Sequence, residues 1–218
     1  MNINIDMRQL ITQDNVERID IEGIIPASIS LYWHPVQLEM LSAGTTAEGR
    51  ESVSGRALLY FIIDGLMGRR DAVIEAQKYE KPRVISGEPH ISVSFSHTDR
   101  QVVAVVSEEF TVGVDIERLD RHVAERIGKR MKHPMEQQNL NEMFTPIQIW
   151  TMKEAALKAI GTGLRQPMNS ICLTVDDRDL RMVTVAFPDG RKGTIHVTSY
   201  KNLTVSICYI RRQSDVTT

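Results

Sequence analysis

The sequence predicts an α+β protein in which one helix and a set of antiparallel strands occur twice along the chain. Residues 47–67 and 147–160 carry apolar side chains at helical spacing. Short alternating or β-branched runs lie around both helices, and Asp, Gly and Pro mark the turns between them. Neighbouring strands joined by such turns pair in antiparallel fashion. The pattern therefore predicts a helix packed on a mainly antiparallel sheet, twice over.

Three strands are expected in the first half, at residues 28–34, 91–95 and 101–107. Residues 91–95 alternate between apolar and polar side chains, and residues 101–107 are largely apolar. A turn at Thr98–Arg100 separates these two strands, so they should pair with each other. Residues 69–80 are charged, and we expect a short helix there that leads into a loop.

In the second half, residues 111–117 are β-branched and predict a buried strand. The helix at 147–160 should begin at Pro146, because proline suits the first helical turn, and should stop at Gly161 and Gly163. The last part of the chain predicts four strands that cover this helix, at Ile171–Val175, Met182–Phe187, Gly193–Tyr200 and Thr204–Ile210.

Composition narrows the class of protein. The chain has 218 residues, of which 42% are hydrophobic, and a net charge of −2, so nothing global points to nucleic acid or a membrane. Cys172 and Cys208 are too few for a secreted disulfide framework, and we expect both to be reduced thiols. The sequence shows no signal peptide and no apolar run of about 18 residues. We therefore expect a cytoplasmic protein.

Two acidic residues stand out in the strand at 111–117. Residues two apart on a strand share a face, so Asp115 and Glu117 should point the same way. Paired carboxylates repel unless a cation lies between them, and Mg²⁺ takes one or two protein carboxylates and completes its shell with water and phosphate. The alternative is the ordinary polar face of an edge strand.

The helix at 147–160 carries the other charged candidates. Glu154 and Lys158 are four residues apart and so lie on one face of the helix, with Lys153 beside them. Taken alone, the pair is more typical of an exposed helix surface than of a site.

Together these stretches resemble the Sfp-type 4′-phosphopantetheinyl transferases, and the resemblance runs from about Ser52 to Leu164. The family's signature is a Gly-x-Asp-x-Glu strand, then Trp-x-x-Lys-Glu-x-x-x-Lys and Gly-x-Gly-Leu, with Lys-Pro and Ser-His motifs upstream. The matching residues, in chain order, are Lys81-Pro82, Ser94-Phe-Ser96-His97, Gly113-Val-Asp115-Ile-Glu117, Trp150 to Lys158, and Gly161-Thr-Gly163-Leu164.

The resemblance implies a fold and an activity. Family members are pseudo-twofold α+β monomers, a pair of similar halves with the active site between them; here the halves would be residues 1–109 and 110–218. The implied activity is that of a holo-[acyl-carrier-protein] synthase type phosphopantetheinyl transferase. It moves phosphopantetheine from coenzyme A to a serine of an apo acyl or peptidyl carrier protein and releases adenosine 3′,5′-bisphosphate. The pathway could be fatty acid, polyketide or nonribosomal peptide biosynthesis.

The resemblance also implies residue roles. Asp115, Glu117 and Glu154 would hold Mg²⁺, and Glu154 would be the general base. Lys158 would face the charge that develops on the leaving phosphate. The remaining coenzyme A-binding candidates are Lys81, Pro82, Ser96 and His97 from the upstream motifs, with Ser96 and His97 on the 3′-phosphate, Lys153 as a phosphate partner, and Arg56 and Ser52 by alignment on Gly55.

The chain departs from the family before the first helix. Members place several Lys or Arg residues there to hold the coenzyme phosphates, whereas this chain has no basic residue between Pro35 and Arg50. Part of the phosphate contact must be missing or come from elsewhere.

Residues 118–133 are strongly basic, and Arg118, Arg121 and Arg126 predict a docking surface for an acidic carrier protein. The alternative is a solvated helix. Two other functions stay open: a metal-dependent phosphate-ester hydrolase that uses the same carboxylates, and an inactive relative that binds carriers without chemistry.

Overall fold

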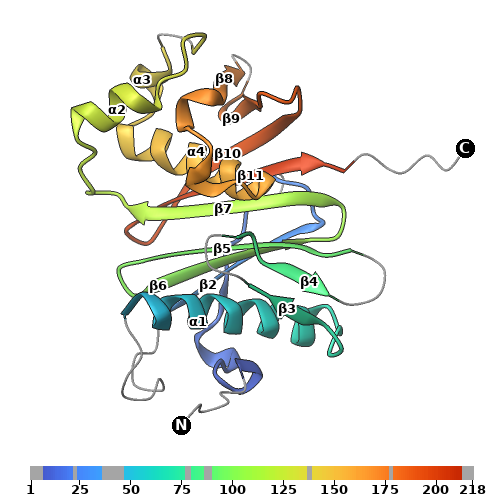
Figure 1. The fold of residues 1–218 in the computed structure, drawn as a ribbon. Helices are drawn as coiled ribbons and strands as arrows, with labels where there is room; N and C mark the ends of the chain where they lie inside the picture. The colour runs from blue at the N-terminus through green and yellow to red at the C-terminus, as the bar shows by residue number, and fades with distance from the viewer. Residues whose placement is uncertain are drawn as a thin grey trace, which may run out of the picture.

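Two antiparallel sheets face each other in the computed structural model, each with a helix on its outer side (Figure 1). The structure describes residues 7–21, 24–35, 47–76, 80–85, 90–136, 139–176 and 179–212. The chain first builds the six-stranded sheet and then the five-stranded sheet.

The first sheet has the strand order β1-β2-β6-β5-β4-β3, with every neighbouring pair antiparallel. Its strands are β1 (Glu17–Arg18), β2 (Ile29–Pro35), β3 (Val73–Glu75), β4 (Arg83–Ile85), β5 (Ser92–Thr98) and β6 (Gln101–Ser107). The helix α1 (Ala47–Tyr60) continues into a π-helical turn, η4 (Phe61–Leu66), and packs on β5 and β6. Two short 3-10 turns, η1 (Met7–Gln9) and η2 (Gln13–Asn15), precede β1.

The second sheet has the order β7-β11-β10-β9-β8. Its strands are β7 (Phe110–Arg118), β8 (Cys172–Asp176), β9 (Asp179–Ala186), β10 (Lys192–Tyr200) and β11 (Leu203–Arg211). The helix α4 (Pro146–Ile160) packs on β7, β10 and β11. The shorter helices are α2 (Glu125–Met131) and α3 (Leu140–Met143), and the 3-10 turns η5 (Gly163–Arg165) and η6 (Met168–Ser170) follow α4.

The position of α4 is set at both ends and in the middle. Thr145 and Gln148 form a capping box at its start, and Gly161 ends it with φ of +79°, a conformation that favours glycine. In the middle, a Cβ at Gly113 would run into the backbone of Ala155 and Ala159. Because glycine has no Cβ, α4 can lie directly against β7.

Serine hydroxyls join the two halves where β5 runs along β7. Among the described residues, no strand forms a backbone ladder on the edge of β7 that faces β5. Instead, Val112 N donates to Ser92 Oγ (3.0 Å) and Val114 N donates to Ser94 Oγ (3.2 Å). These hydroxyls satisfy buried amide groups that would otherwise be costly to leave unpaired. The seam is therefore polar, and we refer to it below as the β5–β7 seam.

A shared hydrophobic core lies between the two sheets. It contains Leu31 and Val105 from the first sheet and Val114, Val205 and Ile207 from the second. Separate cores lie under the two helices. Apolar contact therefore joins the halves beyond the seam.

The predicted α+β class, with a helix on an antiparallel sheet twice over, is confirmed. The helix expected within residues 69–80 is wrong, because β3 forms there and pairs with β4. The strands change from one sheet to the other between Ser107 and Phe110; the division into domains 1–109 and 110–218 stays a prediction. Cys172 and Cys208 are free thiols. In the described residues, none of the helices has the length and apolar character needed to cross a membrane.

Candidate active site

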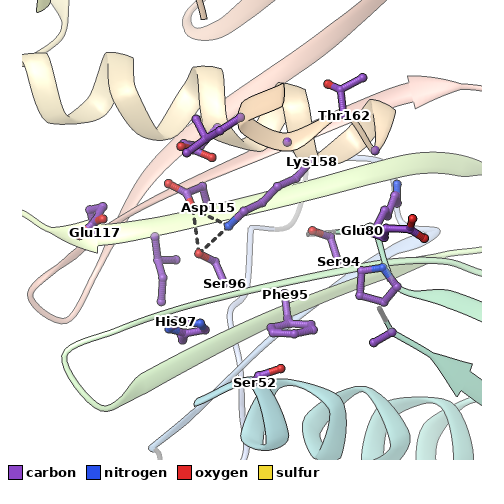
Figure 2. Close-up of a pocket in the computed structure, with 18 of the residues that line it drawn as sticks. Ser52, Glu80, Ser94, Phe95, Ser96, His97, Asp115, Glu117, Lys158 and Thr162 are labelled. Carbon is purple, nitrogen blue, oxygen red and sulfur yellow. Dashed lines mark hydrogen bonds and ion pairs between the residues drawn. The ribbon is translucent and has the colours of Figure 1, made fainter. Parts of the chain in front are cut away.

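A cavity of about 960 Å³ opens at the β5–β7 seam and is lined by residues of both halves (Figure 2). Most of the residues singled out from the sequence meet there: Ser52, Arg56, Lys81, Pro82, Ser96, His97, Asp115, Glu117, Arg121, Glu154 and Lys158. Lys153, Arg118 and Arg126 do not line it. The sequence motifs, spread over a hundred residues, therefore converge on one site.

Three side chains from three different elements form a connected cluster in this cavity. Lys158 of α4 reaches Asp115 of β7 (Nζ to Oδ1, 2.6 Å) and Ser96 of β5 (Nζ to Oγ, 2.9 Å). Ser96 in turn donates to Asp115 Oδ1 at 2.8 Å. Figure 2 shows the lysine descending from its helix between the other two. The cluster holds a positive charge, a negative charge and a hydroxyl in fixed relation.

Ser96 has a different contact from the one its motif implied. The resemblance placed it on the 3′-phosphate of coenzyme A, but here its hydroxyl is engaged with Lys158 and Asp115. It continues the row of seam serines, Ser92 and Ser94, by one more step along β5.

Glu154 lies one turn before Lys158 on the same face of α4. The side chain is largely buried, and this burial, with the nearby charge of Asp115, raises the pKa of its carboxyl to about 7; Lys158 and Arg121 act in the opposite direction. A carboxyl that exchanges its proton near neutral pH is suited to act as a general base.

Glu117 is held by two neighbours. Its Oε2 accepts from Thr98 Oγ1 at 3.2 Å, and Arg121, four residues on, forms an ion pair with it. The guanidinium of Arg121 also lies 5.8 Å from the ring centroid of Trp150. Each carboxylate of the β7 strand thus has its own cation, Lys158 for Asp115 and Arg121 for Glu117.

The carboxylates at this cavity match Mg²⁺ in donor chemistry, since hard oxygens are its preferred ligands. Glu154 adds an observation of its own, because its buried carboxyl lies close enough to Asp115 for the charge of Asp115 to raise its pKa. A cation between them would relieve that repulsion. Among the described residues, no three His, Cys, Asp or Glu side chains are already grouped as a metal site. The fit therefore rests on the donor chemistry of the carboxylates at the cavity and not on a preformed set of ligands.

Lys153 does not reach the cavity, so its expected contact with a coenzyme phosphate is wrong for this structure. Its side chain is fully buried on the other side of α4, where Nζ pairs with Glu136 Oε1 at 2.5 Å. The ammonium also donates to the carbonyls of Met168 and Ile171. Burial lowers the pKa of Lys153, and Glu136 counteracts part of that effect. Because five helical residues turn the side-chain direction by about 140°, Lys153 shares the motif with Lys158 but not the side of the helix.

Lys81 lines the cavity but does not extend its ammonium into it. Its Nζ donates to the carbonyls of Val112 (2.7 Å) and Ala159 (2.8 Å). Burial lowers the pKa of its side chain to about 7. The expectation that Lys81 holds its charge toward a ligand is therefore not met.

Arg56 offers a clearer contact for an anion. Its Nε is buried and has no hydrogen-bond partner among the described residues, and the side chain lines the cavity. Gly55 explains why it is placed there: a Cβ at that position would run into the ring of Phe95, so only glycine lets α1 lie this close to β5. Ser52, one turn earlier, lines the same wall (Figure 2).

Sequence reasoning missed two arginine contacts at this cavity. Arg165 follows the Gly-x-Gly-Leu motif and lines the wall, with its guanidinium bonded to the carbonyls of Gly161 (3.0 Å) and Thr162 (3.2 Å). Its position directly after the motif was the available signal. The pairing of Arg121 with Glu117 was also missed, and the signal there was their spacing of four residues.

The predicted docking arginines have separate environments. Arg118 pairs with Asp120 (2.6 Å) and with Asp99 (3.6 Å), away from the cavity. Arg126 is exposed on α2. Arg121 is therefore the one that joins the basic stretch to the cavity.

Comparison with known proteins points to the same family as the motifs. A family model described as the 4′-phosphopantetheinyl transferase superfamily matches residues 111–208, the part that carries β7, α4 and β11. The resemblance seen in the motifs is thereby confirmed for this part of the chain.

Individual relatives carry the same description. A "4′-phosphopantetheinyl transferase" of Bacillus subtilis is 30% identical over 122 residues, which cover 53% of this chain and 52% of that protein. The "4′-phosphopantetheinyl transferase gsp" of Aneurinibacillus migulanus is 34% identical over 125 residues, 55% of this chain and 49% of that protein. A second B. subtilis protein, "4′-phosphopantetheinyl transferase ffp", is 29% identical over 121 residues. The matched region spans about half the length of these relatives.

Proposed function

We propose that the protein is a 4′-phosphopantetheinyl transferase of the holo-[acyl-carrier-protein] synthase type. Its substrates would be coenzyme A and the serine of an apo acyl or peptidyl carrier protein, and its second product adenosine 3′,5′-bisphosphate. The observation that carries this proposal is the Asp115–Ser96–Lys158 cluster with Glu154 beside it, in a cavity built by both halves.

The chain's own residues can supply the steps of this reaction. A serine hydroxyl must lose its proton to attack the β-phosphorus of the pyrophosphate, and Glu154, which lines the cavity with its pKa raised to about 7, would accept that proton. The bond from that phosphorus to the leaving adenosine 3′,5′-bisphosphate then breaks. Lys158, which lines the same cavity, would stabilise the charge that develops there. Arg56 and His97, on the opposite wall, are suited to the 3′-phosphate.

Mg²⁺ belongs to this proposal as the group that would neutralise the pyrophosphate when bound. Asp115, Glu117 and Glu154 are the residues that would hold it. For Asp115 and Glu117 this requires sharing or releasing the cations that now pair with them, Lys158 and Arg121.

The carrier would approach over the basic stretch at 118–133. Arg121 reaches the cavity from this stretch, so it would lie closest to the reacting serine. Arg126 on α2 extends the positive surface, whereas Arg118 is already neutralised by two aspartates. Charges of this kind mainly raise the association rate. We further propose a monomer that acts in the cytoplasm.

Intact-mass analysis of purified apo carrier proteins, incubated with coenzyme A and Mg²⁺, tests the function. The proposal predicts that a carrier gains the mass of one phosphopantetheine while an equal amount of adenosine 3′,5′-bisphosphate appears. Release of free phosphopantetheine without any carrier would support the hydrolase instead. A carrier that binds the protein but keeps its mass would support the inactive relative.

A further inference from the structure

The contacts of Lys81 join three parts of the molecule. The residue lies in the segment before β4, in the first half of the chain. Its Nζ donates to Val112 O on β7 and to Ala159 O in the last turn of α4, both in the second half. Its side chain also packs beside Gly161: a Cβ placed there would lie 3.5 Å from the Cβ of Lys81.

Both carbonyls need a partner from outside their own element. The last four carbonyls of a helix have no intrahelical donor. In α4, Gly161 N takes those of Leu157 and Lys158, and Lys81 takes that of Ala159. A cation at this end also interacts favourably with the helix dipole.

Val112 lies on the edge of β7 that faces the first half. Its N–H is bonded to Ser92 Oγ, and its carbonyl to Lys81. At Val112, the β5–β7 seam therefore combines a serine hydroxyl that accepts from β7 with a lysine that donates to it.

The two carbonyls that Lys81 binds, those of Val112 and Ala159, lie near Asp115 and Lys158 in the sequence. Ala159 directly follows Lys158, and Val112 comes three residues before Asp115. A donor that holds both carbonyls fixes the last turn of α4 relative to β7. The distance from Lys158 Nζ to Asp115 Oδ1, 2.6 Å, depends on that same relation.

The hydrogen bonds of Lys81 leave it at most one N–H donor for a phosphate. An ammonium has three donors, and Lys81 commits two of them to carbonyls. Pro82 keeps the backbone of Lys81 extended, which suits a side chain directed across the seam.

We infer that Lys81 is a positioning residue: it ties the C-terminal end of α4 and the edge of β7 to the first half of the chain, and it contacts no phosphate. The structural part of this inference is independent of the reaction, and the kinetic part rests on the proposed function.

Amide hydrogen exchange of Lys81→Met, without substrate, tests the tie. Amides of Ala159, Gly161 and Thr162 should exchange at least about tenfold faster than in the parent, while those in the first turns of α4 keep their rates. Arg83→Met, an exposed cation two residues away, serves as the matched control and should change neither. Unchanged exchange at the end of α4 would overturn the inference. If Lys81→Met does not fold, Lys81→Gln, which retains one donor group, replaces it. The exchange rates of the same amides are then compared with those of the parent and of Arg83→Met, and they should rise by a smaller factor.

The kinetic comparison separates a tie from a phosphate ligand. For Lys81→Met, kcat should fall about tenfold or more, the dissociation constant for coenzyme A should stay within about threefold of the parent, and the KM ratio of coenzyme A to dephospho-coenzyme A should not change. A dissociation constant for coenzyme A raised tenfold or more with normal exchange would make Lys81 a ligand and contradict the tie. If the parent itself binds no coenzyme A, the proposed function fails, and the exchange result still decides the role of Lys81.

Discussion

Two lysines of α4 each form an ion pair with a carboxylate from another part of the chain, and the two pairs have different roles. Lys153 pairs with Glu136 at 2.5 Å, and their side chains are 0% and 3% exposed. Lys158 pairs with Asp115 at 2.6 Å, with 28% and 8% exposed, at the wall of the cavity. Five helical residues turn the side-chain direction by about 140°, so the two lysines point to different sides of α4. One pair holds the protein together, and the other belongs to the site.

The surroundings of the two pairs explain this difference. Glu136 also accepts from the backbone amides of His133 and Leu173, and Lys153 also donates to two carbonyls, so every group in that pair is sealed and satisfied. The Lys158 pair has solvent access and a cavity beside it. A charged pair next to a ligand-sized space can exchange partners when a substrate enters, whereas a sealed pair cannot.

Glu154, between the two lysines on α4, gives the largest expected effect. The change Glu154→Gln should lower the transfer rate by about 10²–10⁴-fold, because an amide cannot accept the serine proton. Coenzyme A binding, measured by calorimetry, should stay near that of the parent. Transfer within about threefold of the parent would remove Glu154 from the role of base.

Lys158→Met should lower kcat by about 10²–10³-fold, the range seen when one stabilising donor is removed from a transition state. Its unfolding free energy should fall less than that of Lys153→Met, since Lys158 is partly open to solvent and Asp115, although buried, keeps the hydrogen bond from Ser96 Oγ. Turnover assays test the expected fall in kcat, and urea unfolding tests the expected change in unfolding free energy. A variant that unfolds far more easily than the parent would make Lys158 structural, like Lys153.

Lys153→Met should mainly lower stability, in contrast to Lys158→Met, which should mainly lower kcat. Its unfolding free energy should fall by about 3–5 kcal/mol, because the change leaves Glu136 charged, buried and without its cation. The double change Lys153→Met/Glu136→Leu removes both charges and should recover most of the loss. Chemical denaturation of the two variants provides the test. Recovery of stability without recovery of transfer would give Lys153 a part in the chemistry after all.

The smallest effects are expected at the basic stretch. Reversing Arg126 and Arg130 to Glu, both exposed on α2 and outside the cavity, should raise the KM for the carrier, leave the KM for coenzyme A nearly unchanged and flatten the salt dependence of the rate. Arg121 is left in place because it pairs with Glu117 at the cavity. Reversing Lys192 and Arg211 to Glu, two exposed cations outside the basic stretch and the cavity, is the control for charge alone. Initial rates at several salt concentrations measure the carrier KM and its salt dependence. An unaffected carrier KM would show that the docking surface lies elsewhere, and residues 134–145 would be tested next.

Much of this site could be predicted from the sequence, because spacing determines which residues share a face. The two-residue spacing put Asp115 and Glu117 on one face of a strand, and the four-residue spacing put Glu154 and Lys158 on one face of a helix. That the two pairs meet at one cavity was implied by the resemblance. Spacing does not determine which side of an element faces the cavity or what fills the other side. Lys153 was assigned to a phosphate from the resemblance, although its five-residue spacing from Lys158 turns its side chain by about 140°. Its pairing with Glu136 was not predicted, because Glu136 lies in a loop with no motif.

Contacts across the two halves were the other limit. The serine hydroxyls of the β5–β7 seam and the carbonyls bound by Lys81 depend on how strands far apart in the chain meet, and no local pattern encodes that meeting. The strand β3 was missed because its three residues sit in a charged stretch that resembles a helix surface.

The most direct measurement is intact-mass analysis of an apo carrier protein after incubation with coenzyme A, Mg²⁺ and one of three proteins: the parent, Lys158→Met, or Lys153→Met/Glu136→Leu. The account predicts that the parent and the double variant load the carrier with one phosphopantetheine, and that Lys158→Met loads it at least about a hundredfold more slowly. A carrier of unchanged mass with the parent, or normal loading by Lys158→Met, would contradict it.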